Sequence, residues 1–413
     1  MAEIKDFNRH QYLLNEGNNK NDLPVEENEN DSKSMKKKLA RHRQLRFYTV
    51  FSIVAVIAVI LFVIYINWKN KIYTTYEVIQ QTDYVHSNDT ECFELAGNIL
   101  NYSNDGMNCM DTRGRIIWNQ TYEIQNPIIR SSGKIVAVAD YNGRTIYVAN
   151  TEEILGQINT TMPIRDFCVS ANGIVAVVLD NSTVTSIYLY SCKKKDPLVG
   201  FKTTMSKSGY PIALNISDDG TILAVSYLKA DGGKLTTNIG FYNFSSVGQN
   251  YTDNLVSAYG YSEAVVPMLG FMNNDVSFAL ADNRLMFYQG RQKPENISDI
   301  LISENILSVF NNKNYIGLVY YNSGAETTYR MEIYNTSAQK VTDLYFDMEY
   351  NDIVFGNSSI IIYNSDECII YDWNSNLKYE GSFQNKVKCL IPTSNIERYH
   401  VVVEDYIQLI QLK

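Results

Sequence analysis

The hydrophobic pattern divides this chain into two parts. Residues 47–66, FYTVFSIVAVIAVILFVIYI, form one apolar run without a charge. A helix of this length, at a rise of about 1.5 Å per residue, extends about 30 Å, which is the thickness of the hydrocarbon core of a membrane. The run therefore predicts one transmembrane helix. After residue 66, short apolar runs alternate with turns rich in Gly, Asn and Asp, a pattern typical of β-strands.

The second part contains eight similar phrases, each a polar turn followed by an apolar strand. They begin at Ala96, Ser131, Ser170, Ser217, Asn273, Asn311, Gly356 and Ile396. Steps of roughly 36 to 54 residues between the turns are typical of the blades of a β-propeller. A second strand follows each phrase, and most of these strands mix tyrosine with aliphatic residues. We therefore expect an all-β fold, a β-propeller with eight blades, or with seven if the first phrase belongs to an irregular opening segment.

The phrases also predict positions within a blade. Runs such as IVAVAD (135–140) are apolar throughout, as in strands that are buried on both faces. We assign them to the innermost strand of each blade, next to the propeller axis. In the clearest phrase, SDDGTILAVSYL (217–228), Asp219 and Gly220 indicate a tight hairpin in the fourth blade. We therefore assign Asp218 and Asp219 to turn formation rather than to acid or metal chemistry.

The two ends of the propeller are expected to meet. The last phrase begins too close to the C-terminus for a four-stranded blade, and residues 73–86, YTTYEVIQQTDYVH, could supply its outer strand. Such closure removes the open sheet edges that invite aggregation. A β-sandwich is the alternative fold, but eight phrases exceed what one sandwich needs. Two sandwiches in tandem would predict a Pro/Ser-rich linker near the middle, which the sequence lacks.

Charge predicts the orientation in the membrane. Residues 35–46 carry six Lys/Arg, whereas only Lys69 and Lys71 closely follow the apolar run. By the positive-inside rule the N-terminus is cytoplasmic, and the segment before the run is too long for a cleaved signal peptide. We expect a single-pass protein of the cell membrane. Its parts are a disordered cytoplasmic tail with a basic juxtamembrane run (1–46), the transmembrane helix (47–66), a linker and possible closing strand (67–84), and an extracellular propeller (85–413).

The composition and the loops suggest the kind of partner. Residues 67–413 carry 26 Lys/Arg and 37 Asp/Glu, an acidic balance that argues against binding nucleic acid. Propellers bind ligands through loops on their axial faces, and the longest insertions here are 228–237 and 245–265. The second insertion carries the candidate ligand-binding residues Tyr251, Tyr259 and Tyr261, whose amphipathic rings suit a protein, peptide or sugar. Alternatively, a long hairpin packs its own tyrosines over the edge of the blade.

Cysteine chemistry is open. The six cysteines all follow residue 66: Cys92, Cys109, Cys168, Cys192, Cys368 and Cys389. An oxidising compartment would permit disulfides, with fifteen possible pairings, and small buried thiols are the alternative. Cys92 and Cys109 are close enough in sequence to pair across neighbouring strands. No spacing of Cys and His typical of a metal site occurs.

Several phrases resemble known propeller families. SDDGTILAVS (217–226) resembles a strand of TolB-like and WD-repeat propellers, and DGMNCMDTRGRIIW (105–118) resembles the D-x-x-G-x-x-x-W phrase of quinoprotein-like (PQQ-like) blades. Over about residues 70–413 the chain resembles a family of membrane-anchored exoplasmic propellers from Gram-positive anaerobic bacteria, a domain of unknown function. This resemblance implies a propeller outside the cytoplasmic membrane and brings no activity with it.

The sequence favours binding over catalysis. A quinoprotein dehydrogenase would need vicinal cysteines and a calcium loop, which the chain lacks, and only His86 and His400 follow residue 66. We therefore expect no cofactor, no metal and no enzymatic activity. The expected function is a binding scaffold or sensor for a protein or cell-envelope ligand. The alternatives are a quinoprotein-like or lyase-type enzyme and an accessory factor in envelope assembly.

Overall fold

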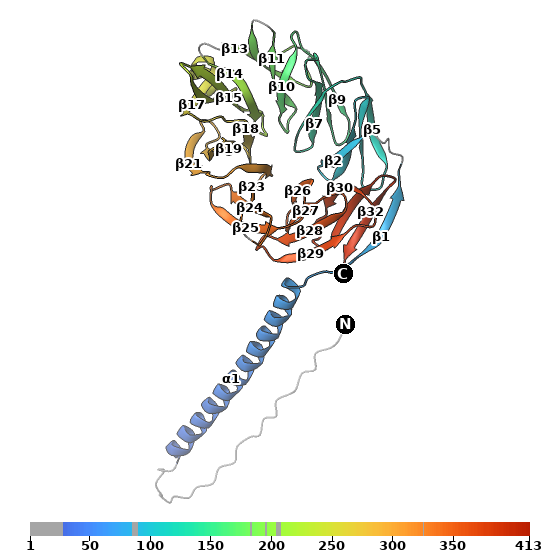
Figure 1. Cartoon of the computed structure of the whole chain (residues 1–413). Coiled ribbons are helices and arrows are strands. Elements are labelled where there is room, and N and C mark those ends of the chain that lie inside the picture. Colours follow the sequence, from blue (N-terminus) through green and yellow to red (C-terminus); the bar gives the residue numbers. More distant parts are fainter. Residues whose placement is uncertain (1–27, 85–89, 182–183, 195, 204–207, 325) are drawn as a thin grey trace, which may run out of the picture. The chain divides into compact units, whose positions relative to one another are not determined.

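The structure is a computed structural model that describes residues 28–413 except 85–89, 182–183, 195, 204–207 and 325 (Figure 1). The chain divides into two units, residues 1–70 and residues 71–413. The first unit contains helix α1 and the second contains the β-strands.

Helix α1 (Asn28–Lys69) is 42 residues long and begins well before the predicted span of 47–66. The basic run at 35–46 is helical because Leu, Ala, Lys, Arg and Gln are strong helix formers. Of the tail that the sequence predicts to be disordered, residues 28–46 are therefore helical, and residues 1–27 lie outside the described residues. The apolar side chains from Phe47 to Tyr65 are exposed. The helix has the length and composition of a membrane anchor or of a signal sequence.

In the described part of the second unit, the strands form eight antiparallel sheets of four strands each, arranged as blades around a centre (Figure 1). This confirms the prediction of an all-β propeller and decides between seven and eight blades. Blades 1 to 4 comprise, in chain order, β2 (Glu91–Leu95), β3 (Asn98–Tyr102), β4 (Gly106–Met110), β5 (Ile116–Thr121); β6 (Pro127–Ser132), β7 (Ile135–Asp140), β8 (Thr145–Asn150), β9 (Ile154–Asn159); β10 (Ile164–Val169), β11 (Ile174–Asp180), β12 (Thr185–Ser191), β13 (Val199–Thr203); β14 (Tyr210–Ile216), β15 (Ile222–Asp231), β16 (Lys234–Asn243), β17 (Leu255–Ser262).

The second half of the ring repeats this order. Blades 5 to 8 comprise β18 (Met268–Phe271), β19 (Val276–Leu280), β20 (Arg284–Gln289), β21 (Glu295–Leu301); β22 (Ile306–Asn311), β23 (Tyr315–Tyr321), β24 (Tyr329–Asn335), β25 (Lys340–Phe346); β26 (Asp352–Phe355), β27 (Ser359–Tyr363), β28 (Glu367–Asp372), β29 (Leu377–Ser382); β30 (Val387–Pro392), β31 (Arg398–Val403), β32 (Tyr406–Leu412) and β1 (Tyr76–Asp83). Two short 3-10 helices, Gly248–Asn250 and Thr252–Asn254, interrupt blade 4 before β17.

The apolar phrases are the second strands of their blades, so their assignment to the innermost position was wrong. The first strands of neighbouring blades contact one another, for example β6 with β10, β10 with β14 and β14 with β18, which places the first strands around the axis. Second strands such as β7 and β19 are almost wholly buried because both of their faces pack against neighbouring blades. First strands such as β6 and β22 line the axis and are only partly buried.

The ends of the second unit close the ring. Strand β1 pairs with β32 in antiparallel register from Tyr76 opposite Leu412 to Asp83 opposite Tyr406, with one irregularity near residue 79. Backbone hydrogen bonds join Lys413 to Thr75 in addition. The last blade therefore receives its outermost strand from the beginning of the propeller, the region in which the sequence placed a closing strand.

The core lies between the blades and is joined there by specific contacts. The indole Nε1 of Trp118 in blade 1 donates a hydrogen bond to the carbonyl of Asn150 in blade 2 at 2.7 Å. Tyr315 in blade 6 stacks on Trp373 in blade 7, with ring centroids 4.0 Å apart. Because each blade packs on its neighbours in this way, the axial faces are left to carry the exposed turns and loops.

Candidate ligand-binding face

One axial face carries the turns between the first and second strands and between the third and fourth strands. We call it the Asp218 face, and define it by the turns 132–134, 170–173, 217–221, 272–275 and 311–314 together with residues 245–254 of the insertion. Strand connections at the other ends of the strands form the opposite face. Antiparallel order fixes this division, because strand direction alternates within every blade.

The turn at 217–221 is held by its own polar side chains. The Ser217 hydroxyl accepts hydrogen bonds from the backbone N–H groups of Thr221 and Ile222 and donates to Asp219 Oδ1 at 2.7 Å. Gly220 has a φ of +69°, and a Cβ there would lie 2.8 Å from the Ile174 side chain of blade 3. Glycine is therefore required for both the turn and the close approach of two blades.

Asp219 also connects three blades. Its backbone carbonyl accepts a hydrogen bond from Asn172 of blade 3 at 2.7 Å, and Arg291 of blade 5 lies 3.2 Å from its carboxylate. Partial burial alone would raise the pKa of Asp219, but hydrogen bonds from Ser217, Thr221 and Arg291 outweigh it and lower this pKa below its ordinary value. Its assignment to turn chemistry therefore fits the structure.

Asp218 does more than form the turn. One carboxylate oxygen accepts a hydrogen bond from the Ser132 hydroxyl of blade 2 at 2.9 Å, and the other lies 2.8 Å from Lys313 Nζ of blade 6. The side chain thus joins turns from three non-adjacent blades across the axial mouth. The sequence phrase alone could not indicate this role, because neither partner is near Asp218 in the chain.

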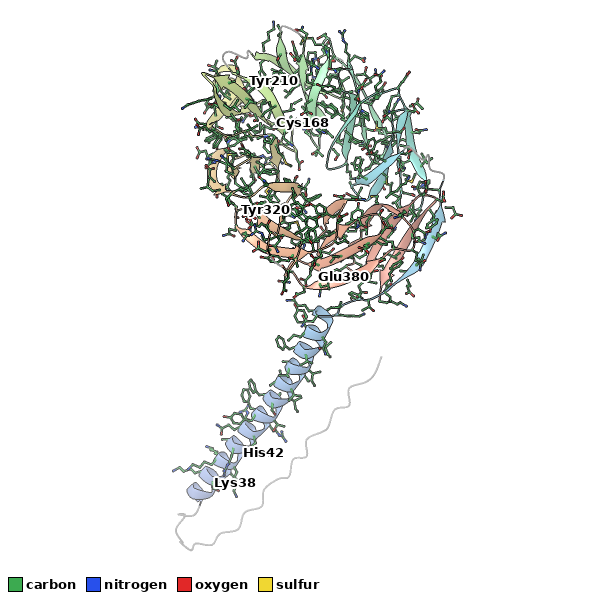
Figure 2. All side chains as sticks on the ribbon, in the orientation of Figure 1. Lys38, His42, Cys168, Tyr210, Tyr320 and Glu380 are labelled. Atoms are coloured by element: carbon green, nitrogen blue, oxygen red, sulfur yellow. The ribbon has the colours of Figure 1, made fainter. Side chains whose placement is uncertain are left out.

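A polar cavity of about 310 Å³ lies beneath these contacts. The first strands of blades 2 to 6 and their turns line it, and its polar groups include Arg130, Asn215, Asp218 and Lys313. Cys168, labelled in Figure 2, lines it from blade 3. Since five blades contribute, this axial cavity belongs to the propeller as a whole and not to one loop.

Charged pairs continue along the axis toward the opposite face. Arg130 lies 2.9 Å from Asp166, whose pKa is raised by burial although the guanidinium opposes this effect. At the opposite face, Arg130 also lines a more open cavity of about 600 Å³ with Tyr141, Arg165 and Tyr210, the last of which is labelled in Figure 2. Arg130 thus contributes to the polar lining of both cavities.

A second cavity on the Asp218 face lies between blades 3 and 4. Its volume is about 480 Å³, and its apolar lining comes from Ile174, Leu189, Leu198, Val199 and Phe244. Asp219 and Gly220 form one wall, and the insertion forms another. We call this the inter-blade pocket. The 217–221 turn therefore separates an apolar pocket from the polar axial cavity.

The three candidate tyrosines have different environments. Tyr251 lies between the two 3-10 helices and is 42% exposed. Tyr261 is buried, and its hydroxyl lies 2.7 Å from that of Tyr288 in blade 5. Tyr259 is half-buried and donates a hydrogen bond to the carbonyl of Pro294 at 3.0 Å. Tyr261 and Tyr259 therefore pack against blade 5 and not over the edge of their own blade, and of the three tyrosines only Tyr251 is exposed.

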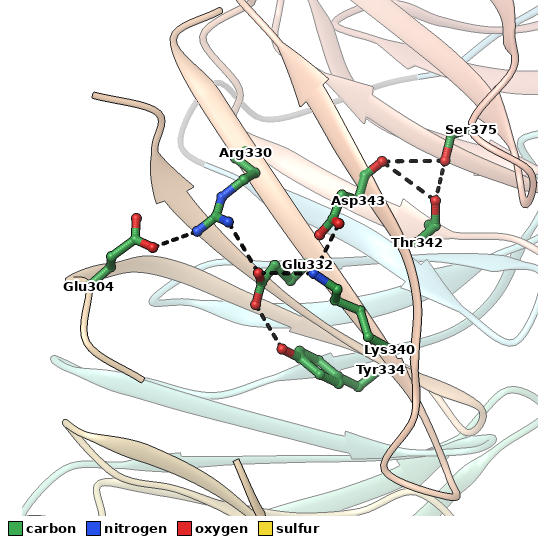
Figure 3. Close-up of polar contacts among 8 residues, drawn as sticks. All are labelled: Glu304, Arg330, Glu332, Tyr334, Lys340, Thr342, Asp343 and Ser375. Atoms are coloured by element: carbon green, nitrogen blue, oxygen red, sulfur yellow. Dashed lines mark hydrogen bonds and ion pairs between the residues drawn. The ribbon is translucent and has the colours of Figure 1, made fainter. Parts of the chain in front are cut away.

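Another polar cluster, in blade 6, has the character of a structural network (Figure 3). Arg330 lies 2.7 Å from Glu304 and 3.2 Å from Glu332, and Lys340 lies 3.0 Å from Asp343. Both cations thus pair with carboxylates of the protein itself. Among the described residues no group of three or more His, Cys, Asp and Glu is arranged to hold a metal ion.

The fold places this chain among the eight-bladed β-propellers that carry one N-terminal apolar helix. Residues 69–412 match the family described as "Family of unknown function (DUF5711)", and the chain belongs to this family. No curated protein matches the sequence.

Solved structures with a similar fold have low identity to this chain. BamB from Moraxella catarrhalis is 11% identical with a TM-score of 0.48, covering 82% of this chain and 100% of that one. The Dos1 propeller is 9% identical with a TM-score of 0.49, covering 80% and 95%. The Pan2 WD40 domain of Neurospora crassa is 8% identical with a TM-score of 0.40, covering 70% and 88%. Similarities at this level give no information on a shared ligand.

Proposed function

We propose that this chain is a membrane-tethered, non-catalytic scaffold that binds a protein partner through the Asp218 face. The observation that carries the proposal is the pair of cavities on this face. An apolar side chain of the partner enters the inter-blade pocket. Hydrogen-bonding groups of the partner next to that side chain reach the axial cavity across the 217–221 turn. Protein interfaces commonly combine an apolar anchor in a pocket with a polar surround.

The paired charges support binding rather than catalysis. Asp218 is held by Ser132 and Lys313, and Asp219 by its turn and Arg291. A general acid or base needs a side chain free to exchange a proton with substrate, whereas these carboxylates are committed to ion pairs that shape the face. Turnover of a small-molecule substrate by the purified full chain, without a partner, would contradict the non-catalytic assignment.

Helix α1 supports the tether, and the basic run at 35–46 supports an orientation with the N-terminus in the cytoplasm. The propeller then lies outside the cytoplasmic membrane. An epitope tag after Lys413, which is exposed, tests this orientation in intact protoplasts. Added protease should remove the tag without lysis, and protection of the tag until lysis would contradict the orientation.

Leu198 and Tyr141 provide a matched pair of variants for the binding face. Leu198 lines the inter-blade pocket and is 44% exposed, while Tyr141 lines the cavity at the opposite face and is 42% exposed. Leu198→Lys places a charge where an apolar anchor would enter, and Tyr141→Lys makes the same change on the other side. Affinity capture from native membranes should lose a bound protein at least tenfold with Leu198→Lys only. Equal capture by both variants and the unmodified chain would contradict the assignment of the face.

A further inference from the structure

We propose that Cys92 and Cys389 form a reversible disulfide across the seam between blade 1 and blade 8. This inference does not rest on the proposed function, since it concerns how the ring is closed. It assigns a redox modification site to two cysteines that lie near opposite ends of the propeller sequence.

The topology brings the two cysteines together. Cys92 lies on β2 and Cys389 on β30, the first strands of the first and last blades, and these two strands contact each other. Both side chains belong to one apolar cluster that also contains Ile99, Ile391 and Val402. The pKa of each thiol is also shifted chiefly by the other thiol, as expected of close neighbours. The seam therefore places the two cysteines on contacting strands within one cluster, the arrangement that a disulfide across it requires.

The expected pairing of Cys92 with Cys109 is not supported, because the two thiols lie on opposite faces of blade 1. Cys92 is opposite Asn101 in the register of β2 and β3, whereas Cys109 is opposite Leu100 in the register of β3 and β4. Neighbouring residues of a strand point to opposite faces of the sheet. Cys109 instead packs toward blade 2, where its thiol lies 3.9 Å from the carbonyl of Thr151.

The remaining cysteines have no comparable partner among the described residues. Cys168, Cys192 and Cys368 are buried in separate apolar clusters. Burial raises the pKa of each of these thiols. They therefore remain protonated and serve as internal controls.

The two thiols of the seam differ in reactivity. The neighbouring Cys389 thiol, aided by the nearby Lys388, lowers the pKa of Cys92 although burial opposes this effect. The Cys92 thiol and burial raise the pKa of Cys389. Cys92 is also the more exposed of the two. Cys92 is thus the attacking thiolate and Cys389 the resolving thiol.

The oxidant is a low-molecular-weight disulfide such as oxidised glutathione. The Cys92 thiolate, having lost its proton to solvent, attacks one sulfur, breaks the S–S bond and releases one glutathione thiolate. Cys389 then loses its proton and attacks the Cys92 sulfur, which releases the second glutathione thiolate and forms the protein disulfide. Two electrons pass from the two cysteines to the glutathione disulfide, and reduction reverses both steps.

The test uses the folded full chain in detergent micelles. The protein is incubated with oxidised or reduced glutathione, free thiols are alkylated, and tryptic peptides are analysed by mass spectrometry. Cys92 and Cys109 share the tryptic peptide 72–113, so the Cys109→Ser variant is analysed in parallel. We expect a peptide linked to residues 389–398 after oxidation in the unmodified chain and in Cys109→Ser. The oxidised forms should also have a higher unfolding temperature than the reduced forms.

Three outcomes would overturn the proposal. They are full alkylation of both thiols after oxidation, separate glutathione adducts on Cys92 and Cys389, and linkage of Cys92 to another cysteine. The unmodified chain shows whether peptide 72–113 becomes linked to residues 389–398, and Cys109→Ser assigns that linkage to Cys92. Cys92→Ser should abolish the rise in unfolding temperature on oxidation, and Cys368→Ser should retain it.

Discussion

Replacement of the insertion tyrosines tests their placement most sharply. Tyr261→Ala removes a buried ring between blades 4 and 5 and leaves the Tyr288 hydroxyl without its nearest partner. Large-to-small replacement of a buried aromatic residue costs about 3–5 kcal/mol. Tyr251→Ala removes a side chain that is 42% exposed, and we expect it to lower the free energy of unfolding by no more than about 0.5 kcal/mol.

These free energies convert to measurable temperatures. A folded unit of roughly 340 residues unfolds with an entropy of about 0.7 kcal/mol/K, so Tyr261→Ala should lower the unfolding temperature by roughly 4–7 °C and Tyr251→Ala by less than about 1 °C. Tyr261→Phe keeps the ring and loses only the hydroxyl, which corresponds to about 1 kcal/mol. Its midpoint should fall by roughly 1–2 °C.

Thermal unfolding of the full chain in detergent, followed by tryptophan fluorescence, measures all three variants under one condition. The expected order of loss is Tyr261→Ala, then Tyr261→Phe, then Tyr251→Ala. A Tyr261→Ala midpoint within 1 °C of the unmodified chain would refute the burial of this residue. Equal losses for Tyr251→Ala and Tyr261→Ala would refute the distinction between them.

Three further predictions concern other parts of the propeller. Gly248→Ala places a Cβ 1.6 Å from the backbone carbonyl of Asn243, so the insertion must shift and thermal unfolding should show a loss of about 1–3 kcal/mol. Burial lowers the pKa of His400 below 6.5, so the neutral side chain contributes stability that is lost as the pH falls below 6.5. The free energy of unfolding of His400→Gln, measured by urea titration, should therefore fall less between pH 6.5 and pH 5 than that of the unmodified chain. Asp218→Asn weakens a partly exposed ion pair with Lys313. It should lower the free energy of unfolding by only about 1 kcal/mol in the same titration, while it reduces partner capture. A decrease of several kcal/mol would identify Asp218 as a residue needed mainly for folding.

Much of the fold was predictable because each blade repeats a local pattern. The eight phrases favoured eight blades and left seven possible, and the short last blade indicated closure by residues near 73–86. The order of strands within a blade was not predictable from apolarity alone. IVAVAD (135–140) is apolar throughout because neighbouring blades bury both of its faces. A strand beside the axis would show the same pattern only if apolar side chains filled the axis.

The candidate site was predictable only in part, because its residues meet through ring closure. The insertion 245–265 does border a pocket, but Tyr261 turned inward, since residues of β17 alternate between the two faces of the blade. The link from Asp218 to Ser132 and Lys313 crosses the axis. No local pattern records such long-range contacts, and the same holds for Cys92 beside Cys389.

Photo-crosslinking from defined positions on the two faces tests directly whether a partner binds the Asp218 face. A photoreactive amino acid is placed at 198 or at 141 in the full chain in native membranes, two positions of nearly equal exposure on opposite faces. We expect a discrete protein adduct from position 198 that is lost when Asp218 is also replaced, and none from position 141. Adducts of equal yield from both positions, or from position 141 alone, would contradict this expectation.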